Sequence, residues 1–248
     1  MDDFERDIES IMEKLRGDLD NFEYSRLLRL RDRLLMLHKR NMVKINHSVM
    51  ELVCAKYLIK RGFRVEVEYT LNGVSCDIYA IKGLGTLIVE VETGFVPPEH
   101  ALDPQRYLRA RIASKIIRYS SYANKFCLAT PPHYIMPIPR ALLKPPRYRT
   151  EVEVETLKRL CDLYYTKPPV TLEEVRNARL HSIYVIDVDE ASVMEMDVEV
   201  YADRGLWDVS ALRWVMENLY VEPPLLSWIS CPPPFHCSYS ASPSSPQV

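Results

Sequence analysis

Alternation of apolar and polar residues is clearest between Gly73 and Gly94, in the stretch GVSCDIYAIKGLGTLIVEVETG. Residues 74–81 and 86–92 each place apolar side chains at every second position. A period of two indicates a strand whose two faces differ. The loop between them, residues 82–85, contains two glycines, which is typical of a hairpin connection. We therefore predict a β-hairpin.

The register of this hairpin decides what its charged residues do. If the loop closes between Ile81 and Thr86, Asp77 lies opposite Glu90, and Ser75 lies opposite Glu92. Directly opposed side chains share a face, with Cβ atoms about 4.5–5.5 Å apart. Two carboxylates this close repel each other, and a divalent cation would relieve the repulsion. A register slip of one residue would separate them and leave an exposed strand pair with scattered charge.

Helical and strand patterns flank the hairpin on both sides. The predicted helices cover residues 3–40 with a break at 17–21, then 46–61, 105–123, 153–164, 172–180 and 209–219. The predicted strands outside the hairpin cover residues 63–69, 125–130, 182–188 and 194–201. Around the hairpin the order is helix, three strands, helix, strand. This order predicts an α/β fold.

Composition divides the chain into four segments. They are an N-terminal helical segment (1–44), a core (45–150), an α/β extension (151–222) and a Pro/Ser-rich tail (223–248). The extension either continues the core domain or forms an appendage. The N-terminal helices either pack on the core or form a homodimer. The tail has seven prolines, seven serines and no Asp, Glu, Lys or Arg, which predicts disorder.

The overall composition excludes several classes of protein. The chain is 47% hydrophobic with a net charge of −2, an ordinary soluble profile, and it has no run of 18 apolar residues. Its first ten residues lack the basic and apolar regions of a signal peptide, so we expect a cytoplasmic protein without a membrane partner. Cys231, His236 and Cys237 lie close together but lack a second ligand pair, which disfavours zinc.

Basic residues are concentrated in one stretch. Residues 105–150 contain no Asp or Glu but carry ten Lys or Arg interleaved with five Tyr. Such a stretch is typical of a phosphate-binding face, and a solvated helix face is the alternative. We predict nucleic acid, DNA in particular, as the partner. The residues expected to contact it are Arg106, Arg109, Arg111, Arg118 and Lys125.

In chain order, these features resemble the PD-(D/E)xK nucleases, the restriction-endonuclease-like superfamily. The resemblance covers residues 45–130: a helix with Glu51, strands with Asp77 and then Glu90 and Glu92, a basic helix and a final strand. It implies an αβββαβ core with a mixed sheet. It also implies a Mg²⁺-dependent deoxyribonuclease, with Mn²⁺ as a possible substitute.

The resemblance assigns roles residue by residue. Asp77 matches the metal-binding aspartate, and Glu90 and Glu51 match the other acidic ligands. Glu92 stands where the superfamily usually has lysine, although some restriction enzymes have glutamate there. In other members a lysine comes from elsewhere, and Lys115 on the next helix is the first candidate, with Arg111 the second. The implied catalytic set is Glu51, Asp77, Glu90, Glu92 and Lys115, with Asp77, Glu90 and Glu51 as metal ligands.

Two residues on the first core helix have local alternatives. Glu51 also completes a capping box with Ser48, which would use its carboxylate at the start of the helix. His47 would reach the metal, as a histidine does in one branch of the superfamily, but we favour a local role at the helix start. Three functions stay open: a nuclease, a nuclease-fold protein that binds nucleic acid without cutting it, and an oligomeric interaction protein built on the N-terminal helices.

Overall fold

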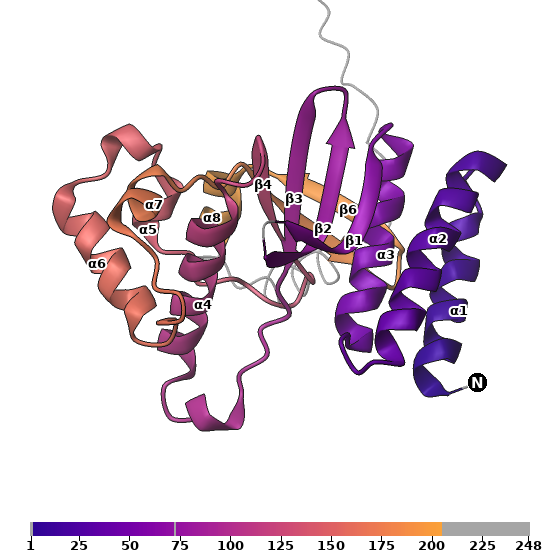
Figure 1. Cartoon of the computed structure of the whole chain (residues 1–248), viewed down its shortest axis with the longest axis horizontal. Coiled ribbons are helices and arrows are strands. Elements are labelled where there is room, and N and C mark those ends of the chain that lie inside the picture. The colour runs from indigo at the N-terminus through magenta and orange to yellow at the C-terminus, as the bar shows by residue number, and fades with distance from the viewer. Residues whose placement is uncertain (1, 72, 205–248) are drawn as a thin grey trace, which may run out of the picture.

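The chain forms a six-stranded mixed sheet with helices packed on both faces (Figure 1). The computed structural model describes residues 2–71 and 73–204. The strands follow chain order across the sheet: β1 (Arg64–Leu71), β2 (Val74–Lys82), β3 (Gly85–Val91), β4 (Lys125–Thr130), β5 (Ser182–Asp187) and β6 (Ser192–Met196). Neighbours β3, β4 and β5 run parallel, and the other pairs are antiparallel. The predicted α/β class is confirmed.

The helices divide into two layers, each with its own apolar core. The N-terminal layer contains α1 (Asp3–Arg16), α2 (Asn21–His38) and α3 (Ile45–Lys60). The opposite layer contains α4 (Pro104–Tyr119), α5 (Arg140–Leu143), α6 (Glu151–Asp162) and α7 (Leu172–Asn177), with α8 (Val198–Arg204) after β6. Short 3₁₀ turns lie at Pro98–His100 and Pro146–Tyr148. The strand order therefore places α3 and α4 on opposite sides of the hairpin.

The hairpin has the predicted register at its closed end. Ile81 pairs with Thr86, and the ladder runs from the Lys82–Gly85 pair to the Ile78–Val89 pair. Beyond that pair, β3 no longer pairs with β2 but continues beside β4, where the Glu92 amide donates to the Ala129 carbonyl. The expected pairing of Ser75 with Glu92 is therefore wrong. Ser75 instead pairs with Thr70 of β1.

Most apolar residues of α1 and α2 are buried, although Phe22 and Met36 of α2 are exposed. Ile8, Leu15, Leu27 and Leu34 are fully buried in the same core as α3. Asp2 caps α1, and Asp20 forms a capping box with Glu23 at the start of α2, so the break near Gly17 separates two stable helices. Of the two sequence-based options, the described contacts show packing on the core. A homodimer through these helices stays a prediction.

Within the described part of the chain, residues 151–204 continue the core domain, because β5 and β6 complete the same sheet. The strand predicted over 194–201 is wrong in its second half. Asp197 accepts hydrogen bonds from the amides of Glu199 and Val200, and this side-chain cap begins α8. The helix predicted at 209–219, the tail at 223–248 and the Cys231–Cys237 group lie outside the described residues.

None of the helices in the described part of the chain combines the length and the apolar character that a membrane span requires.

Candidate metal centre

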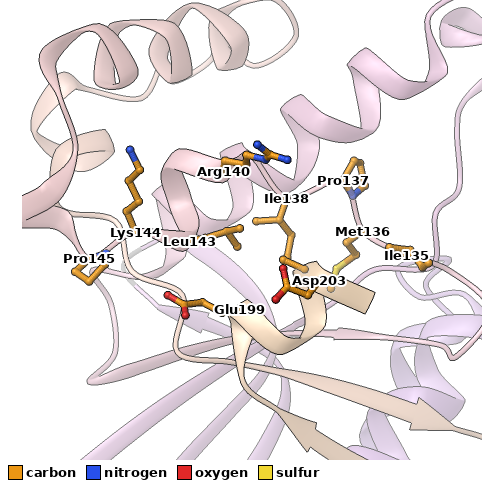
Figure 2. A pocket seen from close by; sticks show the side chains of 11 residues that line it. Ile135, Met136, Pro137, Ile138, Arg140, Leu143, Lys144, Pro145, Glu199 and Asp203 are labelled. Atoms are coloured by element: carbon orange, nitrogen blue, oxygen red, sulfur yellow. The ribbon is translucent and has the colours of Figure 1, made fainter. Parts of the chain in front are cut away.

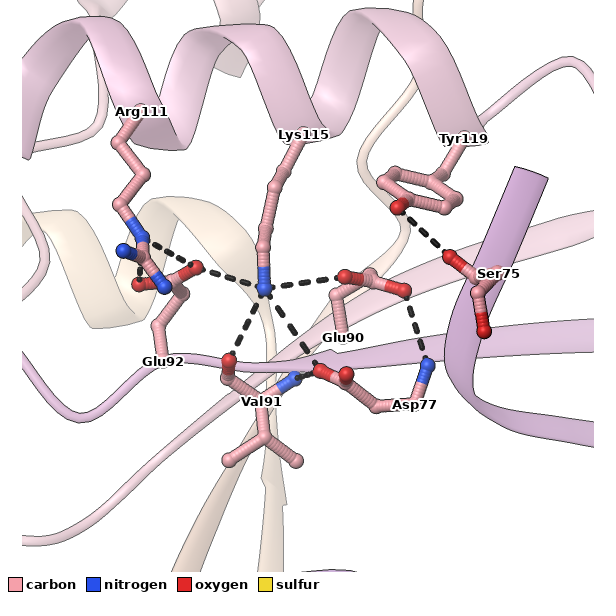
Figure 3. Close-up of polar contacts among 8 residues, drawn as sticks. All are labelled: Ser75, Asp77, Glu90, Val91, Glu92, Arg111, Lys115 and Tyr119. Carbon is pink, nitrogen blue, oxygen red and sulfur yellow. Dashed lines mark hydrogen bonds and ion pairs between the residues drawn. The ribbon is translucent and has the colours of Figure 1, made fainter. Parts of the chain in front are cut away.

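Three hairpin carboxylates gather where β2 and β3 separate (Figure 3). Glu90 and Glu92 alternate with Val89 and Val91, which pack in the α3 layer, so the two glutamates face α4. Asp77 lies where β2 changes faces, because Ile78 packs in the α3 layer and Cys76 in the α4 layer. Asp77 Oδ2 accepts a hydrogen bond from the Val91 amide at 2.6 Å, and the Asp77 amide donates to Glu90 Oε1 at 3.1 Å. The side chains thus satisfy backbone groups that the ladder no longer pairs.

Lys115 of α4 enters the centre of this group. Its Nζ lies 2.7 Å from Glu92, 3.0 Å from Glu90 and 3.6 Å from Asp77, and it donates to the Val91 carbonyl at 3.1 Å. These carboxylates raise the pKa of Lys115 well above its usual value, although burial alone would lower it. The lysine that the resemblance placed on this helix therefore reaches the candidate site.

Glu92 forms ion pairs with two cationic side chains. Arg111 Nε lies 3.0 Å from both of its oxygens, and Lys115 approaches from the other side. Glu92 is only 1% exposed. Burial alone would raise its pKa, but the ion pairs with Lys115 and Arg111 outweigh burial and lower it. Glu92 is consequently ionised, and its charge holds Lys115 in place.

A second group of ligand atoms lies on the α3 side of Asp77. Atoms of His47, Glu51 and Asp77 all lie within 4.8 Å of one another. Glu51 is 0% exposed, and neither of its oxygens has a hydrogen-bond partner among the described residues. A buried carboxyl without partners is rare in folded proteins, and a water molecule or a cation would satisfy it. This group shares Asp77 with the Lys115 side, so Asp77 joins the two.

The capping-box alternative for Glu51 is wrong. The helix α3 begins at Ile45, one turn earlier than that motif requires, and Lys44 caps it without a side-chain hydrogen bond. Ser48 is buried within the helix, and its hydroxyl has no described partner. A ring nitrogen of His47 lies within 4.8 Å of carboxylate oxygens of Glu51 and Asp77, and its local role at the helix start stays a prediction.

Burial and mutual repulsion keep part of this site protonated. Burial first, and then Asp77, raise the pKa of Glu90 to about 8 and that of Glu51 well above its usual value. Burial is also the main reason that the pKa of His47 is lowered, which favours the neutral imidazole. A bound cation would favour the ionised carboxylates and the same neutral imidazole.

Glu68 belongs to this site but was missed from the sequence. Its φ of +47° is in the left-handed region, which is rare for a residue that is not glycine. Arg33 of α2 donates to the carbonyls of Val67 and Glu68, both at 2.7 Å, and so holds the distortion. Burial, and then Asp77, raise the pKa of Glu68 to about 7. We call Glu51, Glu68, Asp77, Glu90 and Glu92 the acidic cluster.

The position of Glu68 could have been predicted from the register of β1 against β2. Val67 pairs with Ile78, and Tyr69 pairs with Cys76, so Glu68 stands opposite Asp77. Placing residues 63–69 against the first hairpin strand by the same alternation argument would have put a third carboxyl beside Asp77. The left-handed conformation itself has no such signal, because glutamate does not favour it.

Replacing Glu68 with glycine tests whether strain is stored here. Glycine removes a left-handed cost of about 1–2 kcal/mol and adds an entropy cost of about 0.5–1 kcal/mol. We expect Glu68→Gly to raise the free energy of unfolding of the metal-free protein, measured by urea denaturation. Glu66→Gly, in the same strand but without positive φ, is the matched control and should lower it. Equal losses in both variants would contradict stored strain at Glu68.

The predicted basic residues do not form one continuous face. Arg106 and Arg109 are exposed and line a cavity of about 660 Å³ against α6. Arg118 donates to the Pro168 carbonyl at 2.6 Å. Lys125 pairs with Leu87, at the opposite end of β3 from Glu92. Of the five residues expected to contact nucleic acid, Arg111 and Arg118 lie nearest to the acidic cluster in the fold, since both lie on the α4 face that carries Lys115.

A cavity of about 740 Å³ lies between residues 135–145 and α8 (Figure 2). Its lining combines Arg140 and Lys144 with Glu199 and Asp203 of α8, above an apolar floor. It shares no residue with the acidic cluster. The mixed charges balance one another, so the cavity has no preference for an anion or a cation.

Protonation of the site predicts how metal-free stability varies with pH. Between about pH 5.5 and 8, folded Glu90 and Glu68, with pKa values of about 8 and about 7, still hold protons that the unfolded chain has already lost near 4.5. The folded state therefore binds more protons, and stability falls as pH rises, by up to about 1 kcal/mol per pH unit for each group. Urea denaturation in EDTA measures this slope. The Glu90→Gln variant should lose stability less steeply with pH than the wild type, whereas the exposed control Glu99→Gln should behave like the wild type. A free energy of unfolding that increases with pH over this range would contradict the assignment.

Comparison with known proteins gives no match: no protein family, no curated protein and no solved structure is similar enough to this chain to identify it.

Proposed function

We propose that this protein is a metal-dependent nuclease that hydrolyses phosphodiester bonds in DNA. The observation that carries the proposal is Glu51, a fully buried carboxyl without partners whose ligand atoms lie beside those of Asp77 and His47. The acidic cluster holds five carboxyl groups, and within the described residues only Lys115 and Arg111 form ion pairs with them. A divalent cation would balance the remaining charge.

The residues present fit such an ion. Carboxylate oxygens suit Mg²⁺ and Mn²⁺, and the imidazole of His47 favours Mn²⁺ over Mg²⁺. Asp77 and Glu51 would hold the ion with His47, and Glu90 lies next to Asp77. When bound, the ion would neutralise charge that develops on a phosphodiester and orient a water molecule.

The cationic side chains supply the rest of the chemistry. Lys115 Nζ would donate to a phosphate oxygen and so stabilise its increased negative charge during attack. Glu92 and Arg111 act on Lys115 by fixing its position, which makes them positioning residues. The raised pKa of Glu90, about 8, would let its carboxyl hold a proton beside Lys115 near neutral pH.

The order of elements also supports the proposal. The helix α3, the strands β1 to β3, the helix α4 and the strand β4 follow one another as αβββαβ. That order, with the site on β2 and β3, is the one that the PD-(D/E)xK resemblance implies. The departure at Glu92 is compensated by Lys115, which reaches the same carboxylates from α4.

Cleavage of DNA under controlled metal conditions tests this function. Supercoiled plasmid and a labelled single strand are incubated with the metal-free protein plus Mg²⁺, Mn²⁺ or EDTA. We expect cutting with Mg²⁺ or Mn²⁺, faster with Mn²⁺ because of His47, and none with EDTA. Cutting that persists in EDTA, or that is absent with both metals, would overturn the proposal.

A nucleic-acid-binding protein without nuclease activity is the second candidate. Glu92 stands in the usual lysine position, and Lys115 already contacts four oxygen-bearing partners, which favours this alternative. The two candidates differ in one result. Salt-sensitive binding of DNA without any metal-dependent cutting would support the second candidate.

A further inference from the structure

A pocket of about 350 Å³ opens beside Lys115, between α4 and the segment before α7. One stripe of α4 forms its wall, with residues at helical spacing. The stripe consists of Tyr107, Arg111, Lys115 and Arg118, and Tyr122 lies just after the helix, which ends at Tyr119. Tyr165 and Pro168–Val170 close the opposite side. Arg111 and Lys115 belong both to this wall and to the ion pairs of the acidic cluster, so the pocket borders the candidate metal centre.

The lining suits a flat aromatic group attached to an anion. Four tyrosines and three permanent cations line the pocket, and the one acid, Glu174, accepts hydrogen bonds from Thr171 in a helix cap. Within the described residues, Tyr122 has neither a side-chain hydrogen bond nor a stacked ring partner. Aromatic rings of this kind stack on nucleobases, and the cations track the phosphates.

Arg118 supplies a donor for such a group. Its guanidinium lies over the ring of Tyr165, with 5.6 Å to the ring centre, and it donates to the Pro168 carbonyl. Its Nε is buried and has no hydrogen-bond partner in the described structure. A buried donor without a partner costs free energy unless an acceptor arrives. A base carbonyl or ring nitrogen would be such an acceptor.

We infer that this pocket binds one unpaired nucleobase next to the phosphate that faces Lys115, so that the preferred substrate is a single-stranded region of a nucleic acid. The inference rests on the proposed function for the position of the phosphate. The volume of the pocket is at the lower end of the range for ligand pockets. A pocket of this size holds one base but not a base pair. A base within a duplex is stacked and paired, so it would have to leave the helix to enter.

Binding without cleavage tests the inference. Fluorescence anisotropy of the full chain in EDTA compares a labelled single strand, the same strand in a blunt duplex, and a single strand whose bases are replaced by abasic sites. We expect the single strand to bind at least about 10-fold more tightly than the other two. Tyr122→Ala should weaken single-strand binding about 5- to 100-fold, whereas Tyr122→Phe, which keeps the ring, should not.

Tyr148→Ala is the matched control, because Tyr148 is an exposed tyrosine of the same basic stretch and does not line this pocket. Thermal unfolding confirms that each variant is folded. Equal affinity for duplex and single strand, or equal losses in Tyr122→Ala and Tyr148→Ala, would overturn the inference. So would wild-type affinity in Tyr122→Ala.

The failures of the inference and of the proposed function are distinguishable. Metal-dependent cutting of duplex and single strand at equal rates, unaffected by Tyr122→Ala, would overturn the base pocket and leave the nuclease. Single-strand binding that depends on Tyr122, without cutting under any metal condition, would leave the pocket and overturn the nuclease. Absence of binding to every strand, in DNA and RNA, would overturn both.

Discussion

Asp77→Asn is expected to lower the rate of metal-dependent DNA cleavage at least about 100-fold, the scale reported for loss of one major electrostatic contact in an active site. Asp77 joins the His47–Glu51 group to the Lys115 side, so removing its charge affects both. The asparagine side-chain oxygen still accepts from the Val91 amide, and one negative charge leaves a crowded region. We therefore expect the variant to fold with undiminished metal-free stability.

Asp189→Asn is the matched control for this loss, because Asp189 is exposed in the turn after β5. It should cut DNA at the wild-type rate. Cleavage and thermal unfolding are measured on the same preparations. An Asp77→Asn protein that cuts at more than about a tenth of the wild-type rate would contradict the role given to Asp77. Loss of folding in that variant would instead contradict the expectation that asparagine is tolerated at this position.

Lys115→Met is expected to destabilise the metal-free protein by about 3–5 kcal/mol, the usual cost of removing one partner from a buried ion pair. The substitution leaves Asp77, Glu90 and Glu92 without their shared cation. Mg²⁺ or Mn²⁺ should restore part of the loss, because a bound ion takes over some of the charge balance. Urea denaturation in EDTA and in excess metal measures both effects.

The control for Lys115→Met is Lys14→Met, at an exposed position of α1. Exposed substitutions of this kind change the free energy of unfolding by no more than about 0.5 kcal/mol. Wild-type stability of Lys115→Met in EDTA would show that the ion pairs contribute nothing net. Destabilisation that metal does not reduce would show that the cation and Lys115 act at separate places.

The hairpin could be predicted from the sequence because its determinants are local. The alternation and the two-glycine loop fix which residues share a face, and the observed Ile81–Thr86 pair confirms the register. The same argument gives the shared face of Glu90 and Glu92 but not the position of Asp77, because Cys76 and Ile78 pack on opposite faces of the sheet. Lys115 could be expected on the helix above them only through the resemblance, since helical spacing alone does not say which face meets the sheet.

Other features of the site depend on tertiary contacts that short motifs do not encode. The strands β2 and β3 separate beyond the Ile78–Val89 pair, where the Asp77 carboxylate accepts from the Val91 amide, so Ser75 does not meet Glu92. The capping motif at Ser48 is overridden because α3 begins earlier, at Ile45. The left-handed Glu68 is held by Arg33, which is distant in sequence.

The basic stretch shows why charge alone is a weak guide to function. Arg149 belongs to it, yet the side chain is 8% exposed and donates to the carbonyls of Ala141, Lys144, Val175 and Arg176. Its burial lowers its pKa, and its role is to join α5 to α7. Arg111 and Lys115 belong to the same basic stretch, but they form ion pairs with carboxylates of the candidate site.

Direct binding of Mn²⁺ tests the central claim, that a divalent cation occupies the group formed by His47, Glu51 and Asp77. Electron paramagnetic resonance distinguishes free from bound Mn²⁺ during titration of the metal-free protein. We predict at least one bound ion per chain, at least about 10-fold weaker binding in Asp77→Asn and Glu51→Gln, and wild-type binding in Asp189→Asn. A wild-type protein that leaves all the Mn²⁺ free, or that binds it as tightly after Asp77→Asn and Glu51→Gln, would contradict the claim.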